Sequence, residues 1–254
     1  MIRREAAYFF AALRFFTRIP APAWVGHSAE QLDHAARYFP LVGWLVGFIG
    51  AAVTLAAAQL WPPGLAVLLG IAATLYVTGA FHEDGLTDTL DGLGGGWTKE
   101  QALAIMKDSR IGSFGAIGIT LALLTKYAAL TALLAASPAP TFLWEVIGAH
   151  AVSRLAATTL IFTLDYARGE GKAKPLATRL SGGEIAFAAL CGLAPCLLLP
   201  PAQAALAALL VALVTLLAAR TFLRRLGGYT GDCLGATQQL TEIAFYLGCA
   251  CACS

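Results

Sequence analysis

One stretch of this chain limits its possible folds more than any other. From Leu41 to Phe81 there is no charged side chain. About 20 apolar residues are enough for a helix to cross a bilayer, and this stretch is roughly twice that length. Trp61-Pro62-Pro63-Gly64 interrupts it with a helix stop and a turn signal. The stretch is therefore predicted to form two membrane-spanning helices.

The composition of the whole chain agrees with a membrane protein. Of 254 residues, 58% are hydrophobic and only 13% are charged, against about 25% charged in an ordinary globular domain. The net charge of +2 is too small to indicate a nucleic-acid partner. We expect one domain over residues 1–254, with the lipid bilayer as its surroundings and no nucleic acid bound. The sequence leaves open whether the protein forms a homo-oligomer.

The predicted fold class is an all-α, polytopic transmembrane bundle of about seven spans. Backbone groups in lipid have no water to bond, so each apolar stretch must be helical. Proline-rich breaks and charged loops set the boundaries. The expected spans are 40–61, 64–82, 113–136, 141–164, 185–200, 202–222 and 234–253.

Basic residues predict the orientation of these spans. Every Lys and Arg except Lys126 and Arg154 lies before the first span or in the loops after the second, fourth and sixth. Positive charge favours the cytoplasmic side. We therefore expect a multi-pass protein of the cytoplasmic (inner) membrane, with these loops inside and the C-terminus outside.

The N-terminal segment is predicted to form an interfacial helix rather than a span. Its apolar run is short, and Arg14 interrupts it. On a helix, Phe9, Leu13 and Phe16 would face lipid. The residues expected to meet lipid headgroups are Arg3, Arg4, Arg14 and Arg18.

The most informative motif runs from His82 to Gly96 and reads H-E-D-G-L-T-D-T-L-D-G-L-G-G-G. Asp84, Asp88 and Asp91 follow the spacing i, i+4, i+7, which places them within about 60° of one another on a helix. Three carboxylates on one stripe repel each other, and a divalent cation such as Mg²⁺ or Mn²⁺ would remove that repulsion.

The other side of this helix and its end are also predictable. Gly92 and the glycines at 94–96 are expected to end the helix and let backbone N–H groups approach a phosphate. The alternative is a solvated acidic helix start, although Asp91 lies near the C-terminal end, where the helix dipole disfavours it. The residues expected to pack into the bundle are Leu86, Leu90 and Leu93.

A second charged cluster follows at residues 106–112, M-K-D-S-R-I-G. Asp108 could complete a metal shell, and Lys107 and Arg110 could hold phosphate oxygens. The alternative for the two basic residues is an ordinary role as positive-inside anchors.

Two further polar residues are candidates because of where they lie. Arg154 is about ten residues inside the fourth span, where a charge is costly and usually functional. It would bind a substrate phosphate or pair with Glu145 or Glu242. Asp232, in G-Y-T-G-D at the start of the last span, would either cap that helix or bind substrate.

These motifs together resemble the cobalamin synthase family. The resemblance rests on the acidic run, on M-K-D-S-R-I-G, and on F-F-T-R-I-P-A-P near residue 15. It extends to F-P-L-V-G at 39, A-V-S-R at 151, Y-A-R-G-E-G at 166 and G-G-Y-T-G-D-C-L-G-A at 227. Lys107 and Tyr229 are small departures from the family pattern.

The resemblance implies an enzyme that needs Mg²⁺. Such an enzyme joins adenosylcobinamide-GDP to α-ribazole or α-ribazole 5′-phosphate and releases GMP. The implied catalytic residues are His82, Asp84, Asp88 and Asp91, with either His82 or a metal-free carboxylate as the proton acceptor. The candidate metal ligands are Glu83, Asp84, Asp88, Asp91 and Asp108. The candidate substrate-binding residues are Lys107, Arg110, Arg154, Arg168, Thr230 and Asp232.

Two other functions remain alternatives. A CDP-alcohol-type membrane phosphotransferase of lipid synthesis would also carry an aspartate cluster, but its D-G-x-x-A-R signature is absent here. A cation transporter would place carboxylates along a pathway through the spans. Here only Glu145 and Glu242 are clearly inside spans.

Overall fold

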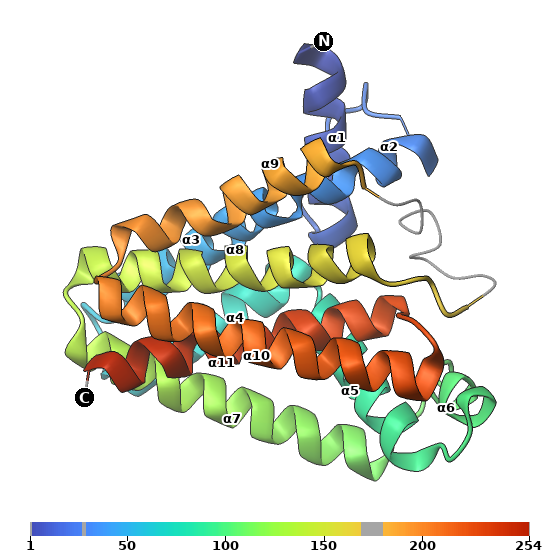
Figure 1. The fold of residues 1–254 in the computed structure, drawn as a ribbon. Coiled ribbons are helices and arrows are strands. Elements are labelled where there is room, and N and C mark those ends of the chain that lie inside the picture. Colours follow the sequence, from blue (N-terminus) through green and yellow to red (C-terminus); the bar gives the residue numbers. More distant parts are fainter. Residues whose placement is uncertain (1, 27–28, 169–179, 254) are drawn as a thin grey trace.

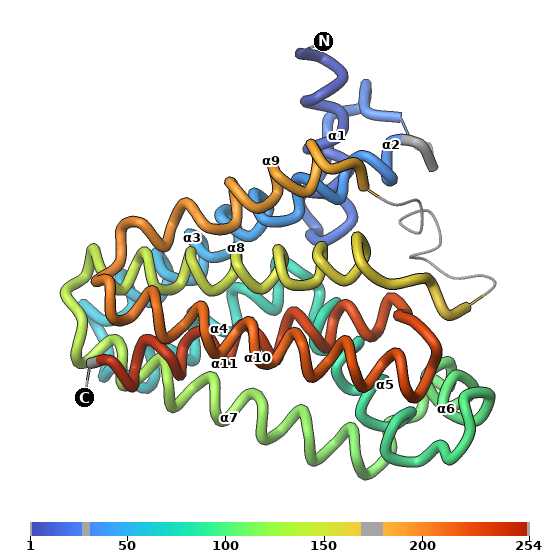
Figure 2. The backbone as a smooth tube through the Cα atoms, in the orientation of Figure 1, coloured from blue at the N-terminus to red at the C-terminus, as the bar shows by residue number. Residues whose placement is uncertain are grey.

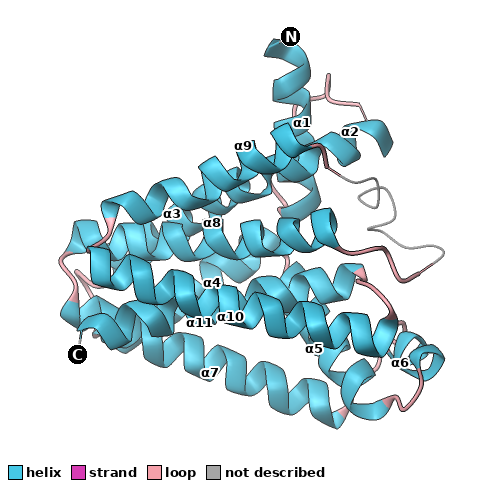
Figure 3. Ribbon diagram, in the orientation of Figure 1, coloured by secondary structure: helices cyan, strands magenta, loops and turns pink. Residues whose placement is uncertain are grey.

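The computed structural model describes residues 2–26, 29–168 and 180–253. In these residues the chain folds into helices and loops without a β-strand (Figure 3). The elements are α1 (Ile2–Phe16), α2 (Ala29–Ala35), η1 (Ala36–Tyr38), α3 (Phe39–Ala57), α4 (Pro63–Thr78), α5 (Phe81–Gly95), α6 (Lys99–Ile105), α7 (Ser113–Ala136), α8 (Ala139–Thr163), α9 (Gly182–Leu193), η3 (Ala194–Leu198), α10 (Pro201–Leu226) and α11 (Gly231–Cys253).

Long helices lying side by side form the body of the molecule (Figure 1). α8 packs against α3, α9 and α11, and α11 packs in turn against α5, α7 and α10. The tube in Figure 2 shows the chain passing back and forth between the two ends of this bundle. α1 and α6 lie at one end, and the C-terminus lies at the other. The predicted all-α bundle is confirmed.

Four helical segments among the described residues are long and apolar enough to cross a membrane. They are residues 31–57, α7, α8 and α10. α4 has only 16 residues, and the apolar segment Gly182–Leu198 is also short. α11 has 23 residues but is too polar to qualify. The predicted count of about seven spans is therefore not confirmed.

The predicted second span, 64–82, ends earlier than expected. α4 stops at Thr78, and Gly79 and Ala80 both take left-handed backbone conformations, with φ of 65° and 55°. α5 then continues at 88° to α4, so the pair would make a fifth span only if it counted as one broken span. A glycine tolerates this conformation, whereas an alanine rarely adopts it. The bend turns the acidic helix across the end of the bundle.

The helical form of the N-terminal segment is as predicted, but its apolar face is not turned to lipid. Leu13 and Phe16 are buried within the protein core, and Phe9 packs against Tyr38 with ring centroids 6.1 Å apart. The prediction failed because an amphipathic pattern does not distinguish lipid from protein as the apolar partner. Arg14 donates to the carbonyl oxygen of Gly26 at 2.9 Å.

Candidate active site

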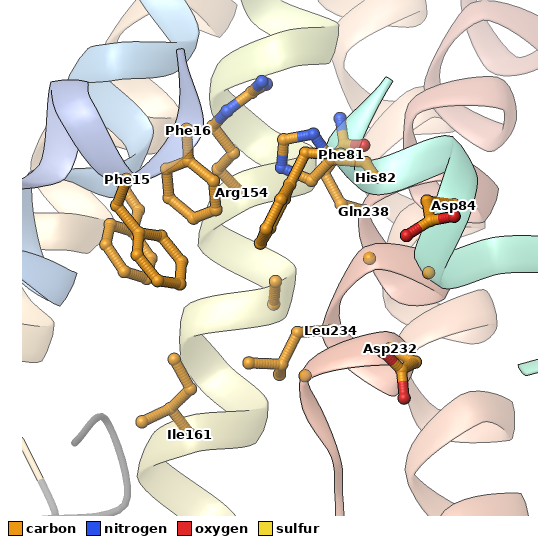
Figure 4. A pocket seen from close by; sticks show the side chains of 15 residues that line it. Phe15, Phe16, Phe81, His82, Asp84, Arg154, Ile161, Asp232, Leu234 and Gln238 are labelled. Atoms are coloured by element: carbon orange, nitrogen blue, oxygen red, sulfur yellow. The ribbon is translucent and has the colours of Figure 1, made fainter. Parts of the chain in front are cut away.

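A pocket with a cavity volume of about 100 Å³ opens among α1, α3, α5, α8 and α11. One side is aromatic, and the other carries polar side chains from α5, α8 and α11 (Figure 4). The aromatic residues are Phe15, Phe16, Phe39 and Phe81. The polar residues are His82, Asp84, Arg154, Asp232 and Gln238.

Two glycines bring the acidic helix against the last helix. A Cβ on Gly85 would lie 3.2 Å from the Cα of Gly235, and a Cβ on Gly235 would lie 3.1 Å from the carbonyl oxygen of His82. α5 and α11 therefore cross backbone to backbone. This crossing places Asp84 and Asp232 in the wall of the same pocket.

The start of α11 directs Asp232 into the pocket rather than along its own helix. The hydroxyl of Thr230 accepts the backbone N–H of Cys233 at 3.2 Å, so Thr230 caps the helix. Asp232 forms an ion pair with Arg168, with its Oδ2 2.8 Å from Nη2 of the guanidinium. Of the two roles that the sequence left open for Asp232, capping therefore belongs to Thr230.

Asp88 shares this carboxylate group from one turn further along α5. It is partly exposed. Burial, followed by the neighbouring carboxylates of Asp84 and Asp232, raises the pKa of Asp88 to about 6 against the opposing effect of Arg168. Asp84, Asp88 and Asp232 thus form a group with an excess of negative charge. We call these three residues the carboxylate group.

Asp91 lies on the predicted stripe but has different partners. Its carboxylate accepts the backbone N–H groups of Gly112 at 2.7 Å and Gly115 at 2.8 Å. These donors belong to the start of α7, so Asp91 caps that helix from outside. A Cβ on Gly115 would lie only 2.3 Å from Asp91 Oδ2. α5 ends in the glycine run at 94–96, as predicted, but Gly92 lies inside the helix.

The other predicted metal ligands are not brought to the carboxylate group. Glu83 is buried and faces Lys126, with its Oε1 4.0 Å from Nζ. Asp108 accepts from Arg110 at 2.6 Å, and this hydrogen bonding lowers the pKa of Asp108 to about 2. Lys107 is exposed on the same loop. These residues therefore stand apart from the pocket.

Arg154 is almost fully buried and lines the pocket from α8. Its Nη1 donates to the carbonyl oxygen of His150 at 2.9 Å. Neither partner suggested by the sequence bonds it directly. Glu145 accepts from Ser137 at 2.8 Å, and Glu242 lies 3.3 Å from His150 Nδ1.

A buried ion-pair network lies behind the pocket, and its contacts were not predicted from the sequence. Lys126 Nζ lies 3.0 Å from Glu242 Oε1 and donates to Gln239 at 2.8 Å. Gln238 donates to Glu242 at 2.6 Å and also reaches the pocket wall. The available signal was the presence of isolated charged and amide side chains within apolar helices, where each needs a partner.

The aromatic side of the pocket was not predicted from the sequence either. Phe16 was expected to face lipid, and Phe15, Phe39 and Phe81 were not assigned a role. They come from three different helices, so only the tertiary fold brings them together. Phe16 also stacks on His82 with ring centroids 5.1 Å apart, which fixes the imidazole in the pocket wall.

The carboxylates of the site bear on whether a divalent cation would fit there. Within residues 2–26, 29–168 and 180–253, no three His, Cys, Asp or Glu side chains are close enough together to hold a metal ion. Mg²⁺ commonly takes only one or two carboxylates and fills its other positions with substrate phosphates and water. The hard oxygen donors and mutual repulsion of the carboxylate group fit that chemistry.

Comparison with known proteins gives a consistent set of relatives. The family model described as cobalamin-5-phosphate synthase matches residues 8–250. A Ralstonia nicotianae protein named adenosylcobinamide-GDP ribazoletransferase is 50% identical over 243 residues, which cover 95% of this chain and 94% of that protein. Proteins of the same name from Leptothrix cholodnii and Shewanella amazonensis are 48% and 46% identical, each over 96% of this chain and 95% of its own length. No solved structure matches.

Proposed function

The chain belongs to the cobalamin-5-phosphate synthase family, and from this membership we propose that it is an adenosylcobinamide-GDP ribazoletransferase. It transfers the adenosylcobinamide-phosphate group of adenosylcobinamide-GDP to α-ribazole or α-ribazole 5′-phosphate. GMP leaves, and adenosylcobalamin or its 5′-phosphate forms. The observation that carries this proposal is the family match over almost the whole chain.

The reaction requires one bond to phosphorus to form and one to break. A ribose hydroxyl that is free in both acceptors, and is therefore not the 5′-hydroxyl, attacks the phosphorus attached to cobinamide, and the bond to the GMP oxygen breaks. The attacking hydroxyl loses its proton to a base. Such a transfer depends on positioning and on charge neutralisation more than on covalent chemistry by the protein.

We further propose that Mg²⁺ is the cofactor and that one or two of the carboxylates of Asp84, Asp88 and Asp232 would hold it. Bound Mg²⁺ supplies positive charge to the pyrophosphate oxygens. The geometry favours this set over the five residues expected from the sequence, because Glu83, Asp91 and Asp108 have other partners.

The remaining polar residues have roles in binding and proton transfer. Arg154 and Arg168 lie at the pocket and beside Asp232, and both can donate to substrate oxygens or nitrogens. Lys107 and Arg110 are exposed outside the pocket. We expect them to contact the part of the large anionic substrate that extends beyond the pocket. The proton acceptor is His82 or a carboxylate that does not hold the cation; both types line the pocket.

The membrane setting is part of the proposal. The chain is a multi-pass membrane protein with several apolar helices. We place it in the cytoplasmic membrane with the pocket facing the cytoplasm. This orientation rests on the concentration of Lys and Arg in the segments at one end of the bundle.

The direct test is to incubate the purified protein with adenosylcobinamide-GDP, α-ribazole and Mg²⁺. GMP and a cobalamin should form in equal amounts. GMP release that does not require α-ribazole would indicate hydrolysis rather than transfer and would contradict the proposal. Neither alternative function is favoured by a feature of the pocket.

A further inference from the structure

The pocket has an aromatic half that the chemistry at phosphorus does not use. Phe16 and Phe39 meet edge to face with centroids 4.4 Å apart, and Phe15 lies parallel to Phe39 at 6.1 Å. Phe81 closes the group at 5.4 Å from Phe15. Ile161 continues this apolar lining on α8. We call Phe15, Phe16, Phe39 and Phe81 the aromatic wall.

The rings of this wall differ in how far they are buried. Phe16 and Phe39 are buried, whereas Phe15 and Phe81 are partly exposed. Figure 4 shows the rings of Phe15 and Phe16 on the opposite side of the pocket from Asp84 and Asp232. A ligand that fills the pocket therefore needs a flat apolar end against the rings and a polar end beside the carboxylates.

The substrates of the proposed reaction offer three bulky groups for this space. A corrin ring with its side chains is larger than the drug-sized ligands held by pockets of roughly 300–1,000 Å³. Guanine is flat, but several donors and acceptors on its edge would be left unpaired against phenylalanine side chains, which is costly. The benzimidazole base of ribazole is flat and apolar apart from one ring nitrogen free to accept a hydrogen bond.

A donor for that nitrogen is present in the pocket wall. Arg154 lines the pocket, and its Nε is buried without a hydrogen-bond partner among the described residues. Its Nη1 is held by His150, so the guanidinium is fixed in place. One buried donor matches one acceptor on the base.

We propose that the aromatic wall and Arg154 bind the benzimidazole base of the ribazole acceptor, with the ribose turned toward Asp84 and Asp232. This inference rests on the proposed function and assigns one part of the pocket to one of the two substrates. The pyrophosphate of adenosylcobinamide-GDP then meets the ribose hydroxyl at the carboxylate group. The corrin and guanosine parts stay outside the aromatic wall.

The test uses substitutions that keep an apolar side chain but remove the flat ring. Phe15→Leu and Phe81→Leu change the two partly exposed rings, so the protein core keeps Phe16 and Phe39. Phe48→Leu is the matched control, because Phe48 lies on α3 like Phe39 but is 52% exposed and outside the pocket. The full-length protein is used in detergent micelles or nanodiscs.

Two quantities are measured for each variant. The first is the Kd of α-ribazole without the second substrate; the second is the KM of each substrate. Loss of base stacking should raise the Kd and KM for α-ribazole on the order of tenfold in the two pocket variants. The KM for adenosylcobinamide-GDP should stay unchanged, and so should all values for Phe48→Leu.

Two results would overturn the inference. A raised KM for adenosylcobinamide-GDP with unchanged α-ribazole binding would assign the wall to the guanosine or corrin part. Unchanged values for both substrates would mean that the wall is structural. Failure of the proposed function is a separate result, because the unaltered protein would then form no cobalamin from either acceptor.

Discussion

At the scale of single residues, the spacing of Asp84, Asp88 and Asp91 on α5 predicts one shared face, yet their surroundings differ. Asp84 lines the pocket. The pKa of Asp88 is raised by burial and then by the negative charges of Asp84 and Asp232. Asp91 is bonded to the backbone at the start of α7. A common face therefore does not give the three carboxylates a common role.

Asp84→Asn and Asp88→Asn test the carboxylate group. Each change removes one charge and preserves size, so kcat should fall by roughly 10²-fold or more if these residues support charge neutralisation at the pyrophosphate. The helix should stay folded, because Leu86 remains buried on its other face. Turnover is measured over a range of Mg²⁺ concentrations, and raising Mg²⁺ should recover part of the loss. Turnover close to that of the unaltered protein at low Mg²⁺ would remove these residues from the site.

Asp91→Asn should behave differently from these two variants. An amide accepts less well than a carboxylate at the N-terminus of α7, so the change should lower stability by about 1 kcal/mol, as for loss of a helix cap. Any loss of activity should follow the lower Tm and should not respond to added Mg²⁺. Recovery by Mg²⁺ as large as that of Asp84→Asn would instead return Asp91 to the cation site.

At the scale of elements, the crossing of α5 and α11 sets the distance between Asp84 and Asp232. Gly235→Ala would place a methyl group against the backbone of His82 and Gly85, which cannot move aside as a side chain can. The expected cost is about 1–3 kcal/mol, with a lower kcat because the two helices separate. Gly183→Ala is the control, since nothing lies within 4 Å of a Cβ there. Equal Tm and kcat for both variants would show that the crossing tolerates extra volume.

The docking of α1 predicts a dependence of stability on pH. Arg37 pairs with Glu5 of α1 and, at 3.0 Å, with Glu184 of α9. Burial acts to raise the pKa of Glu5, but hydrogen bonds from Tyr38 and Arg37 outweigh it, and the pKa is lowered. The folded-state pKa thus lies below the unfolded value of about 4.3. The stabilisation is complete above that value and is lost as the pH falls through the folded pKa.

Thermal unfolding followed from about pH 6 to about pH 3 checks this pH dependence. The Tm of the unaltered protein should decrease more steeply on acidification than the Tm of Glu5→Gln, which has no proton to gain at this position. Parallel curves for the two proteins would show that the contact between Glu5 and Arg37 contributes nothing to stability.

The sequence predicted some elements closely and others poorly, for physical reasons. The span predicted at 113–136 coincides with α7, because a charged loop precedes it and Ser137-Pro138 follows it. The 88° bend after Thr78 was missed, because Ala80 gives no signal for the left-handed conformation that it adopts. Local patterns locate helix ends well but do not show how consecutive helices turn.

The candidate site shows the same limit more strongly. The spacing of the acidic run predicted a shared site for Asp84, Asp88 and Asp91, and of these three Asp84 lines the pocket, as does Asp232 of G-Y-T-G-D. The contact between Lys126 and Glu242, and the aromatic wall, depend on residues far apart in the sequence. No periodicity within one helix records such a contact, so the fold was needed to find them.

At the scale of the whole molecule, the pocket and the basic segments lie together. The segments that carry most Lys and Arg side chains reach the end of the bundle opposite the C-terminus (Figure 1). The pocket opens among the helices that meet near this end, beside α1 and α5. If positive charge is retained in the cytoplasm, both substrates must reach the protein from that side.

The most direct test of the proposed reaction and orientation is to measure transfer in sealed membrane vesicles of the two opposite orientations. Adenosylcobinamide-GDP is large and charged, so it does not cross a sealed bilayer. With α-ribazole and Mg²⁺ added outside, inverted vesicles that expose the cytoplasmic face should release GMP and form cobalamin in equal amounts. Right-side-out vesicles should do so only after they are permeabilised. Equal activity in intact vesicles of both orientations, or no cobalamin even after permeabilisation, would contradict the account.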